Sequence, residues 1–248
     1  MWYLDVVDKF PINKGDIVNI SSDLLPFMCK IREKKEKFDQ NKFLDALVDK
    51  VGKDGTILVS TYNWDYCQGK IFDSKKTSSQ VGGLGNTAIK RDDFKRTKHP
   101  IYSFCVKGKD SNYLTSIDPK NAFGKGTVFE YLYNNKAKNL FIGLDYKKAL
   151  TFVHFPEEIV GVDYRYQKEF VSDYVEDGKL VKKGYQFYVR EPSKCKMTHI
   201  DEKLDKLLKN YWYEFIEDVY FGVVDLKEIG DIMIQDLKTK KEIVYPKV

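Results

Sequence analysis

A strand–helix–strand pattern near the N-terminus constrains the fold of this chain more than any other feature. Residues 16–21 follow a Gly-Asp pair and are predicted to form a short strand. Residues 41–52 carry apolar side chains at helical spacing, and Gly52 is predicted to end the helix. Residues 55–64 form a nearly continuous β-branched and apolar run, which is typical of a strand buried on both faces. This order predicts an α/β fold with parallel strands.

The same alternation continues more loosely in the middle of the chain. A helix is predicted over 127–133, a buried strand over 139–144, and another helix from about Ala149. Between residues 166 and 192, two alternating runs flank a Glu-Asp-Gly-Lys segment, and this pattern predicts a β-hairpin.

The C-terminal part has a different character. Apolar spacing predicts a helix over 200–221, and residues 231–246 are predicted to form a second hairpin. No repeat or low-complexity linker divides the chain. We therefore predict a single α/β domain over residues 1–248, with a mixed, partly parallel central sheet, flanking helices and antiparallel additions near the C-terminus.

Composition and charge exclude several classes of protein. No apolar run approaches the roughly 20 residues that cross a bilayer, and the acidic N-terminal segment does not resemble a signal peptide, so we expect a cytoplasmic protein without a membrane partner. Lys and Arg number 42 against 37 Asp and Glu, a net charge of +5. No nucleic-acid-binding motif accompanies this mild excess, and we expect no nucleic-acid partner. A homo-oligomer is allowed, because the sequence leaves the oligomeric state open.

The cysteines and the densest basic stretch both have structural interpretations. Cys29, Cys67, Cys105 and Cys195 are scattered without a paired spacing, so we expect reduced, mostly buried thiols and no metal site. Residues 30–37 are rich in lysine but interrupted by two glutamates, and a solvated helix face is the expected explanation.

The chain contains only three histidines, and two of them stand in motifs. His99 lies in Thr-Lys-His-Pro, directly before an alternating apolar run, and His154 lies in Thr-x-x-His-x-x-Glu. His199 stands alone in a polar segment and is expected at the surface. Histidine titrates near neutrality, and a carboxylate behind it can fix its tautomer, so these residues are candidates for general-base catalysis.

Several short motifs follow one another in a fixed order across nearly the whole chain. They are Gly15-Asp16, Ser21-Ser22, Gly55 to Thr61, Thr97-Lys98-His99-Pro100 with Ser103-Phe104, Phe123-Gly124 with Thr127, and Thr151-x-x-His154-x-x-Glu157. Each motif alone is weak, but the ordered set resembles the antibiotic N-acetyltransferase family, of the aminoglycoside 3-N-acetyltransferase type. The chain departs from that pattern at Phe155-Pro156, and a proline there must lie in a first helical turn or at a kink.

The resemblance implies an enzyme that moves an acyl group from acyl-CoA to an amine. It implies His99 as the general base, oriented by Glu157, with the hydroxyls of Ser22 and Thr151 near the thioester. Pro156 leaves open whether Glu157 or Glu158 supports the base. His154 is either a second catalytic residue or a buried histidine that only makes hydrogen bonds.

The resemblance also implies a binding site for acyl-CoA as cosubstrate. The residues expected to contribute to it are Ser21, Ser22, Gly82, Gly83, Thr127 and Thr151. The glycines of residues 81–86 could line the phosphates through their bare backbone, or they could form an ordinary loop, since no strict phosphate-loop spacing is present.

The acceptor is inferred from charge. A basic chain favours anionic small molecules, and the family includes enzymes that acylate nucleotide-linked amino sugars in surface polysaccharide biosynthesis. We therefore expect a nucleotide-linked amino sugar as acceptor and acetyl as the default acyl group. Two alternatives stay open, an aminoglycoside 3-N-acetyltransferase that confers antibiotic resistance and a non-catalytic relative that binds a sugar nucleotide.

Overall fold

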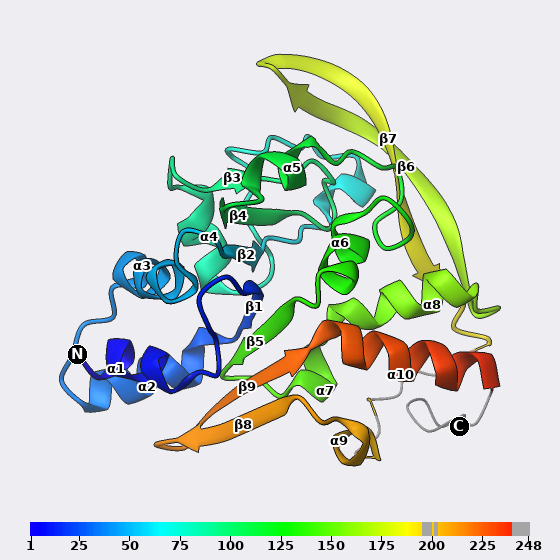
Figure 1. Cartoon of the computed structure of the whole chain (residues 1–248). Coiled ribbons are helices and arrows are strands. Elements are labelled where there is room, and N and C mark those ends of the chain that lie inside the picture. The colour runs from blue at the N-terminus through cyan, green and yellow to red at the C-terminus, as the bar shows by residue number, and fades with distance from the viewer. Residues whose placement is uncertain (195–199, 201–202, 240–248) are drawn as a thin grey trace.

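The computed structural model describes residues 1–194, 200 and 203–239, and its centre is a seven-stranded mixed sheet (Figure 1). The strand order across this sheet is β3-β4-β2-β1-β5-β9-β8. The strands span Ile17–Ser22 (β1), Thr56–Ser60 (β2), Lys95–Arg96 (β3), Phe104–Gly108 (β4), Lys138–Ile142 (β5), Tyr211–Ile216 (β8) and Val219–Asp225 (β9). The predicted α/β class with a mixed sheet is confirmed.

The parallel core of the sheet is the part that the sequence predicted best. β1 pairs in parallel with β2 on one side and with β5 on the other, while the remaining neighbours are antiparallel. The helix between β1 and β2 is α3 (Gln40–Val51), and the Asp39 side chain caps its first turn. Gly52 ends α3 with φ +68°, as predicted, because a residue without Cβ adopts this conformation without strain.

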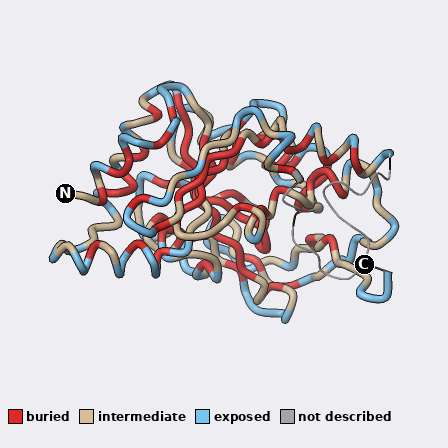
Figure 2. The backbone as a smooth tube through the Cα atoms, turned by 90° about the horizontal axis from the view of Figure 1, so that it is seen from below, coloured by how far each residue is buried: buried red, intermediate tan, exposed pale blue. Residues whose placement is uncertain are grey.

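Two layers of helices cover the sheet, one on each face. One face packs against α1 (Trp2–Lys9), α2 (Leu24–Glu33), α3 and α4 (Gly83–Ile89). The other face packs against α5 (Ser111–Ser116), α6 (Val128–Asn134), α7 (Tyr146–Ala149), the 3₁₀ turn η2 (Thr151–Val153), α8 (His154–Val160), α9 (Lys203–Leu207) and α10 (Leu226–Thr239). Buried residues concentrate along the central strands between these layers (Figure 2).

Side-chain alternation along β1 and β5 separates an apolar face from a partly polar one. Val18, Ile20 and Leu140 point into the core beneath α1–α4. Asn19 and Asn139 point to the opposite face and are buried there, because successive residues of a strand face opposite sides. The polar face is therefore the one covered by η2 and α8.

The predicted hairpin within residues 166–192 is present as a separate two-stranded sheet. Strands β6 (Arg165–Glu176) and β7 (Lys179–Arg190) meet at Asp177 and Gly178, which both have positive φ, as a tight two-residue turn requires. The hairpin arches away from α8 along one side of the molecule (Figure 1). Near it, Tyr66 of the 3₁₀ turn η1 (Asp65–Gln68) donates to the carbonyl of Lys183 at 2.5 Å.

The predicted helix over 200–221 is wrong. Among the described residues of this range, only α9 is helical, and β8 and β9 form an antiparallel hairpin at the sheet edge. The turn residues Glu217 and Asp218 both have positive φ, which no continuous helix accommodates. The aromatic residues of this segment satisfied the helical spacing, but they also suit strands, and pairing with β5 decided between the two.

The second predicted hairpin, over 231–246, is also wrong where the structure describes it. Residues 226–239 form α10, and Ile229 and Met233 are buried four residues apart on one helical face. Residues 240–246 of the predicted hairpin lie outside the described part of the chain, as do Cys195 and His199.

None of the helices among residues 1–194 and 203–239 has the length and apolar character to cross a membrane. Cys105 is buried and Cys67 is half-buried, but Cys29 is exposed on α2, so the prediction of buried thiols is wrong for Cys29.

Candidate active site

The connections of the sheet diverge at the carboxyl end of β1. The chain passes from β1 to β2 on one side, and the parallel strand β5 lies on the other side. In open α/β sheets, ligands bind beyond the carboxyl ends of the strands where the connections diverge in this way. The residues at these ends are Ser21 and Ser22 of β1, Ser60 of β2 and Ile142 of β5.

Ser21 and Ser22 point to opposite faces of the sheet, because they are consecutive in β1. Ser22 lies against Gly82, at which an added Cβ would come within 2.8 Å of the Ser22 carbonyl oxygen and 3.0 Å of its hydroxyl. Ser21 accepts a hydrogen bond from Nδ2 of Asn139 at 3.3 Å. Ser22 and Gly82, which were both predicted to bind acyl-CoA, therefore lie against each other. Ser21 points instead to the helical layer that contains η2 and α8.

A buried polar chain connects the strand ends to Thr151. Asn19 donates to Asn139, and the hydroxyl of Ser60 donates to Asn19 at 3.3 Å or to the phenol oxygen of Tyr62 at 3.2 Å. Burial raises the pKa of Tyr62, and the hydroxyls of Ser60 and Thr151 oppose this rise. The hydroxyl of Thr151 is therefore a hydrogen-bond partner of the Tyr62 phenol, two residues after the end of β2.

Thr151, His154 and Glu157 share one helical face. The turn η2 begins at Thr151 and continues without a break into α8, which begins at His154, so residues three apart lie one above another. Pro156 is the third residue of α8. The prediction that this proline lies in a first helical turn is confirmed, since a backbone N–H there has no helical partner to lose.

The central feature of the site is the contact between His154 and Glu157. Nδ1 of His154 lies 2.7 Å from Oε2 of Glu157, whose side chain is only 3% exposed, whereas His154 is 22% exposed. An ionised carboxylate accepts the proton on Nδ1, which leaves Nε2 unprotonated and able to take a proton. No hydrogen bond or ion pair engages Nε2 of His154 within the described residues.

Two residues at the start of the hairpin also hold the Glu157 carboxylate. The phenol of Tyr164 donates to Oε1 at 3.1 Å, and Nε of Arg165 lies 2.7 Å from Oε2. The N–H of Arg165 is not aligned with the oxygen, so this short contact is an ion pair rather than a directed hydrogen bond. Neither residue was predicted, because no sequence pattern shows that a strand leaving α8 will pass back over Glu157.

Glu158 faces a different part of the structure. Its Oε1 accepts from the side-chain amide of Asn121 at 2.7 Å and lies against Gly124. Of the two glutamates, Glu157 is therefore the one that contacts a histidine.

The expected pairing of Glu157 with His99 is wrong, because Glu157 contacts His154. His99 is 7% exposed, and its Nδ1 accepts the backbone N–H of Tyr102 at 3.1 Å. Burial lowers the pKa of His99 to about 4, although backbone groups of Gln186 and Lys120 and the charge of Asp118 act in the opposite direction. Its ring packs against Tyr185 of the hairpin, at 5.2 Å between centroids.

The cavity beside His99 is small. The cavity that it lines with Tyr102 and Thr127 has a volume of about 10 Å³, which is about the space that one water molecule needs. A larger hollow of about 400 Å³ lies between α1 and α3, in the helical layer opposite α8. It contains none of the predicted site residues.

Thr127 and Gly83 have local structural roles. Thr127 is buried and caps α6: its hydroxyl accepts from the backbone N–H of Glu130 and donates to the carbonyl of Gly124. Gly83 begins α4, and an added Cβ would lie 3.1 Å from a methyl group of Leu24. Among the described residues, no group of three His, Cys, Asp or Glu side chains is arranged to hold a metal ion.

A histidine beside a buried carboxylate is the arrangement that enzymes with a general base use, and N-acyltransferases are one class of such enzymes. The family model for aminoglycoside 3-N-acetyltransferase matches residues 31–237, and the chain belongs to this family. The prediction of an acyltransferase is thereby confirmed. No curated protein matches the sequence of the chain.

Solved structures share the fold over almost the full chain. AAC-VIa bound to sisomicin is 17% identical with a TM-score of 0.76, over 96% of this chain and 97% of that one. AAC-IIIb in a binary complex with CoASH is 15% identical with a TM-score of 0.77, over 96% and 95% of the two chains. The YokD protein from Bacillus subtilis is 18% identical with a TM-score of 0.72, over 94% and 96%.

Proposed function

We propose that this protein transfers an acetyl group from acetyl-CoA to an amino group of an amino sugar, with His154 as the general base. The observation that carries this proposal is the 2.7 Å contact between His154 and the buried Glu157 in a chain of this family. His154 is preferred to His99 because it is partly exposed and paired with a carboxylate, whereas His99 is enclosed.

The reaction requires one proton to be moved twice. The amine nitrogen attacks the thioester carbonyl carbon while Nε2 of His154 takes a proton from the amine. The tetrahedral intermediate then collapses, the carbon–sulfur bond breaks, and the imidazolium returns the proton to the leaving thiolate. The products are an amide and free CoA. Glu157 stabilises the imidazolium that exists between the two transfers.

The donor site is proposed at the carboxyl end of β1. The CoASH complex of AAC-IIIb supports acyl-CoA as the cosubstrate. Ser22 and the Gly82 backbone lie together at the strand end, and the hydroxyl of Thr151 lies one turn before His154, where a donor for the developing oxyanion would be needed.

An aminoglycoside is the acceptor that the family description and the sisomicin complex of AAC-VIa support best. A nucleotide-linked amino sugar is the second candidate, and the net charge of +5 favours it, because a basic chain attracts an anion. Apart from membership of the family, none of the comparisons supports a nucleotide-linked amino sugar as the acceptor.

A thiol-release assay with acetyl-CoA distinguishes these acceptors. The panel contains kanamycin-like amines, a nucleotide-linked amino sugar and the same sugar without its nucleotide. Higher kcat/KM for the polycationic amines supports the aminoglycoside acceptor, and higher kcat/KM for the nucleotide-linked sugar supports the second candidate. Absence of thiol release with every amine contradicts the proposed function itself.

A further inference from the structure

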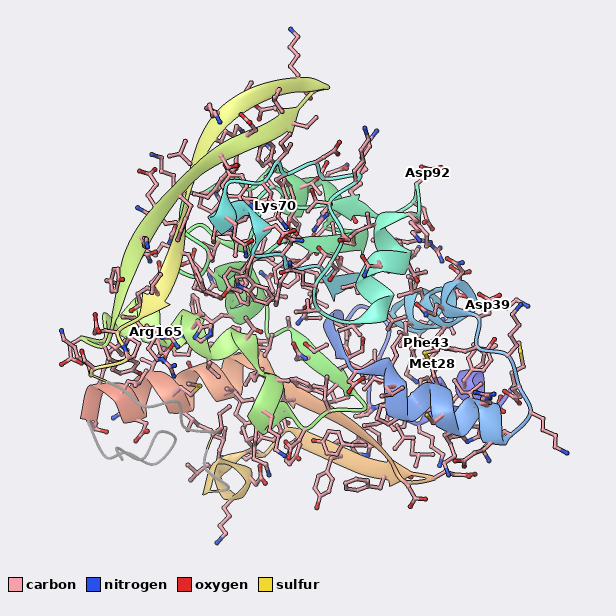
Figure 3. The ribbon with its side chains drawn as sticks, turned by 180° about the vertical axis from the view of Figure 1, so that it is seen from behind. Met28, Asp39, Phe43, Lys70, Asp92 and Arg165 are labelled. Carbon is pink, nitrogen blue, oxygen red and sulfur yellow. The ribbon has the colours of Figure 1, made fainter. Side chains whose placement is uncertain are left out.

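We propose that Arg165 is a positioning residue that limits how strongly Glu157 stabilises the protonated form of His154. This inference rests on the proposed role of His154 as the base. Arg165 is the first residue of the hairpin and lies at its base next to α8, on the side of the molecule shown in Figure 3. Its guanidinium contacts Oε2, the same carboxylate oxygen that contacts His154.

The guanidinium is fixed from two sides. Its Nη1 donates to the carbonyl of Tyr188 at 3.2 Å, and its carbon lies 5.7 Å from the Tyr188 ring centre. The Tyr188 phenol in turn donates to the backbone carbonyl of Glu157 at 3.3 Å. Arg165 is 13% exposed, so water screens its charge weakly. Both strands of the hairpin therefore hold this cation against Glu157.

Three charges meet when the base takes its proton. Before transfer, Arg165 and Glu157 form a neutral pair beside an uncharged imidazole. After transfer, the carboxylate is shared between two cations, and Arg165 repels the imidazolium. A base that held its proton too tightly would be protonated at neutral pH and would return the proton slowly to the leaving thiolate. Arg165 opposes this, because its positive charge offsets part of the attraction between Glu157 and the imidazolium.

The neighbouring tyrosines do not titrate in the pH range in which an effect of Arg165 on His154 is measured. Burial raises the pKa of Tyr188 to about 12, and the carboxylates of Glu157 and Glu158 add to this rise. Burial likewise raises the pKa of Tyr102 to about 12, although the charge of Arg165 opposes it. Both phenols stay protonated between pH 5 and 9. Within the described residues, the Tyr164 phenol also contacts Glu157, and the charge of Glu158 acts on Tyr188.

The test compares Arg165→Gln with Arg165→Lys, with Arg190→Gln as the matched control. Arg190 lies directly opposite Arg165 in the hairpin, and no hydrogen bond or ion pair links it to Glu157 in the described structure. We expect Arg165→Gln to move the acid limb of the kcat/KM profile to higher pH by roughly one pH unit, since a like charge that contacts the same carboxylate has an effect of that order. Arg165→Lys and Arg190→Gln should leave the limb within a few tenths of a pH unit of the unsubstituted enzyme.

A lower kcat at every pH with an unmoved acid limb would overturn the inference, because a merely structural role gives that result. NMR titration of the His154 ring, assigned by its absence in His154→Asn, gives the same midpoint without activity. If the unsubstituted protein releases no thiol with any amine, the proposed function fails, while this titration still tests the effect of Arg165.

Arg165→Gln leaves Glu157 buried without its cation and could prevent folding. In that case, Glu157→Gln is compared with the double variant Glu157→Gln/Arg165→Gln, which has no buried charge at this point. The ring titration midpoint should be higher in the double variant, because the repulsion by Arg165 is gone. Equal midpoints contradict the proposal.

Discussion

Oε2 of Glu157 lies 2.7 Å from Nδ1 of His154, one helical turn earlier in the chain, and lies 2.7 Å from Nε of Arg165 on the hairpin. One carboxylate oxygen thus joins a partly exposed helix residue to a cation held by a separate sheet. Substitutions at any of these three residues change the charge or the hydrogen bonding at this oxygen.

His154→Asn should lower kcat by roughly two to four orders of magnitude, the usual contribution of a general base. The affinity for acetyl-CoA should change little, because the proposed donor residues lie at the end of β1. His99→Asn is the matched substitution in the enclosed cavity and should keep kcat within a few-fold. Thiol-release kinetics of the two variants decide between the histidines, and the reverse ranking would restore His99 as the base.

Glu157→Gln should reduce kcat far more than Glu158→Gln. A glutamine at position 157 no longer fixes the tautomer or stabilises the imidazolium, so a loss of roughly a hundredfold or more is expected. Glu158 accepts one hydrogen bond from Asn121, which a glutamine oxygen can also accept. Both variants should be checked for folding by circular dichroism. Equal losses in kcat would show that Glu157 contributes no more to the reaction than Glu158 does.

The stability of the protein should fall between pH 6.5 and 4 because of His99. The pKa of His99 is lowered by burial from 6.5 to about 4, so the unfolded chain binds a proton in this range and the folded chain does not. The contribution of the neutral His99 to the free energy of unfolding is fully present above pH 6.5. About 2 to 3 kcal/mol of it is lost by pH 4.5. Urea unfolding at pH 7.5 and 4.5 measures it.

His99→Asn provides the comparison, since its amide oxygen can accept the Tyr102 backbone N–H in place of Nδ1. The free energy of unfolding of this variant should depend less on pH by about the same 2 to 3 kcal/mol. An identical pH dependence in both proteins would mean that His99 is not kept neutral by the fold.

Gly82→Ala should raise KM for acetyl-CoA and lower the melting temperature. Gly82 has φ +70°, and its new Cβ would meet Ser22 at 2.8 Å. Gly15→Ala is the matched control, with φ +88° and no atom within 4 Å of the added Cβ. Both variants bear the backbone strain of roughly 1 to 2 kcal/mol, but only the first should displace Ser22. An unchanged KM in Gly82→Ala would remove Ser22 and Gly82 from the donor site.

The sequence determined the parallel core of the fold and the residues on α8. The β-branched run before Ser60 and the helical spacing before Gly52 are local patterns, and each corresponds to one element of the structure. The spacing from His154 to Glu157 is local as well, since three residues form nearly one turn of a helix. These parts could be predicted because their causes lie within a few residues.

Long-range packing determined which histidine contacts the carboxylate and which segments form the sheet edge. His99 lies 58 positions before Glu157, and its burial depends on packing against Tyr185 from the hairpin. Residues 211–225 became strands because β5 offered an edge to pair with, although their aromatic spacing also suited a helix. The contact of Arg165 with Glu157 likewise arises where the hairpin returns over α8. Local propensity is weak compared with the burial and pairing gained at such long-range contacts, so their outcome is fixed only when the chain folds.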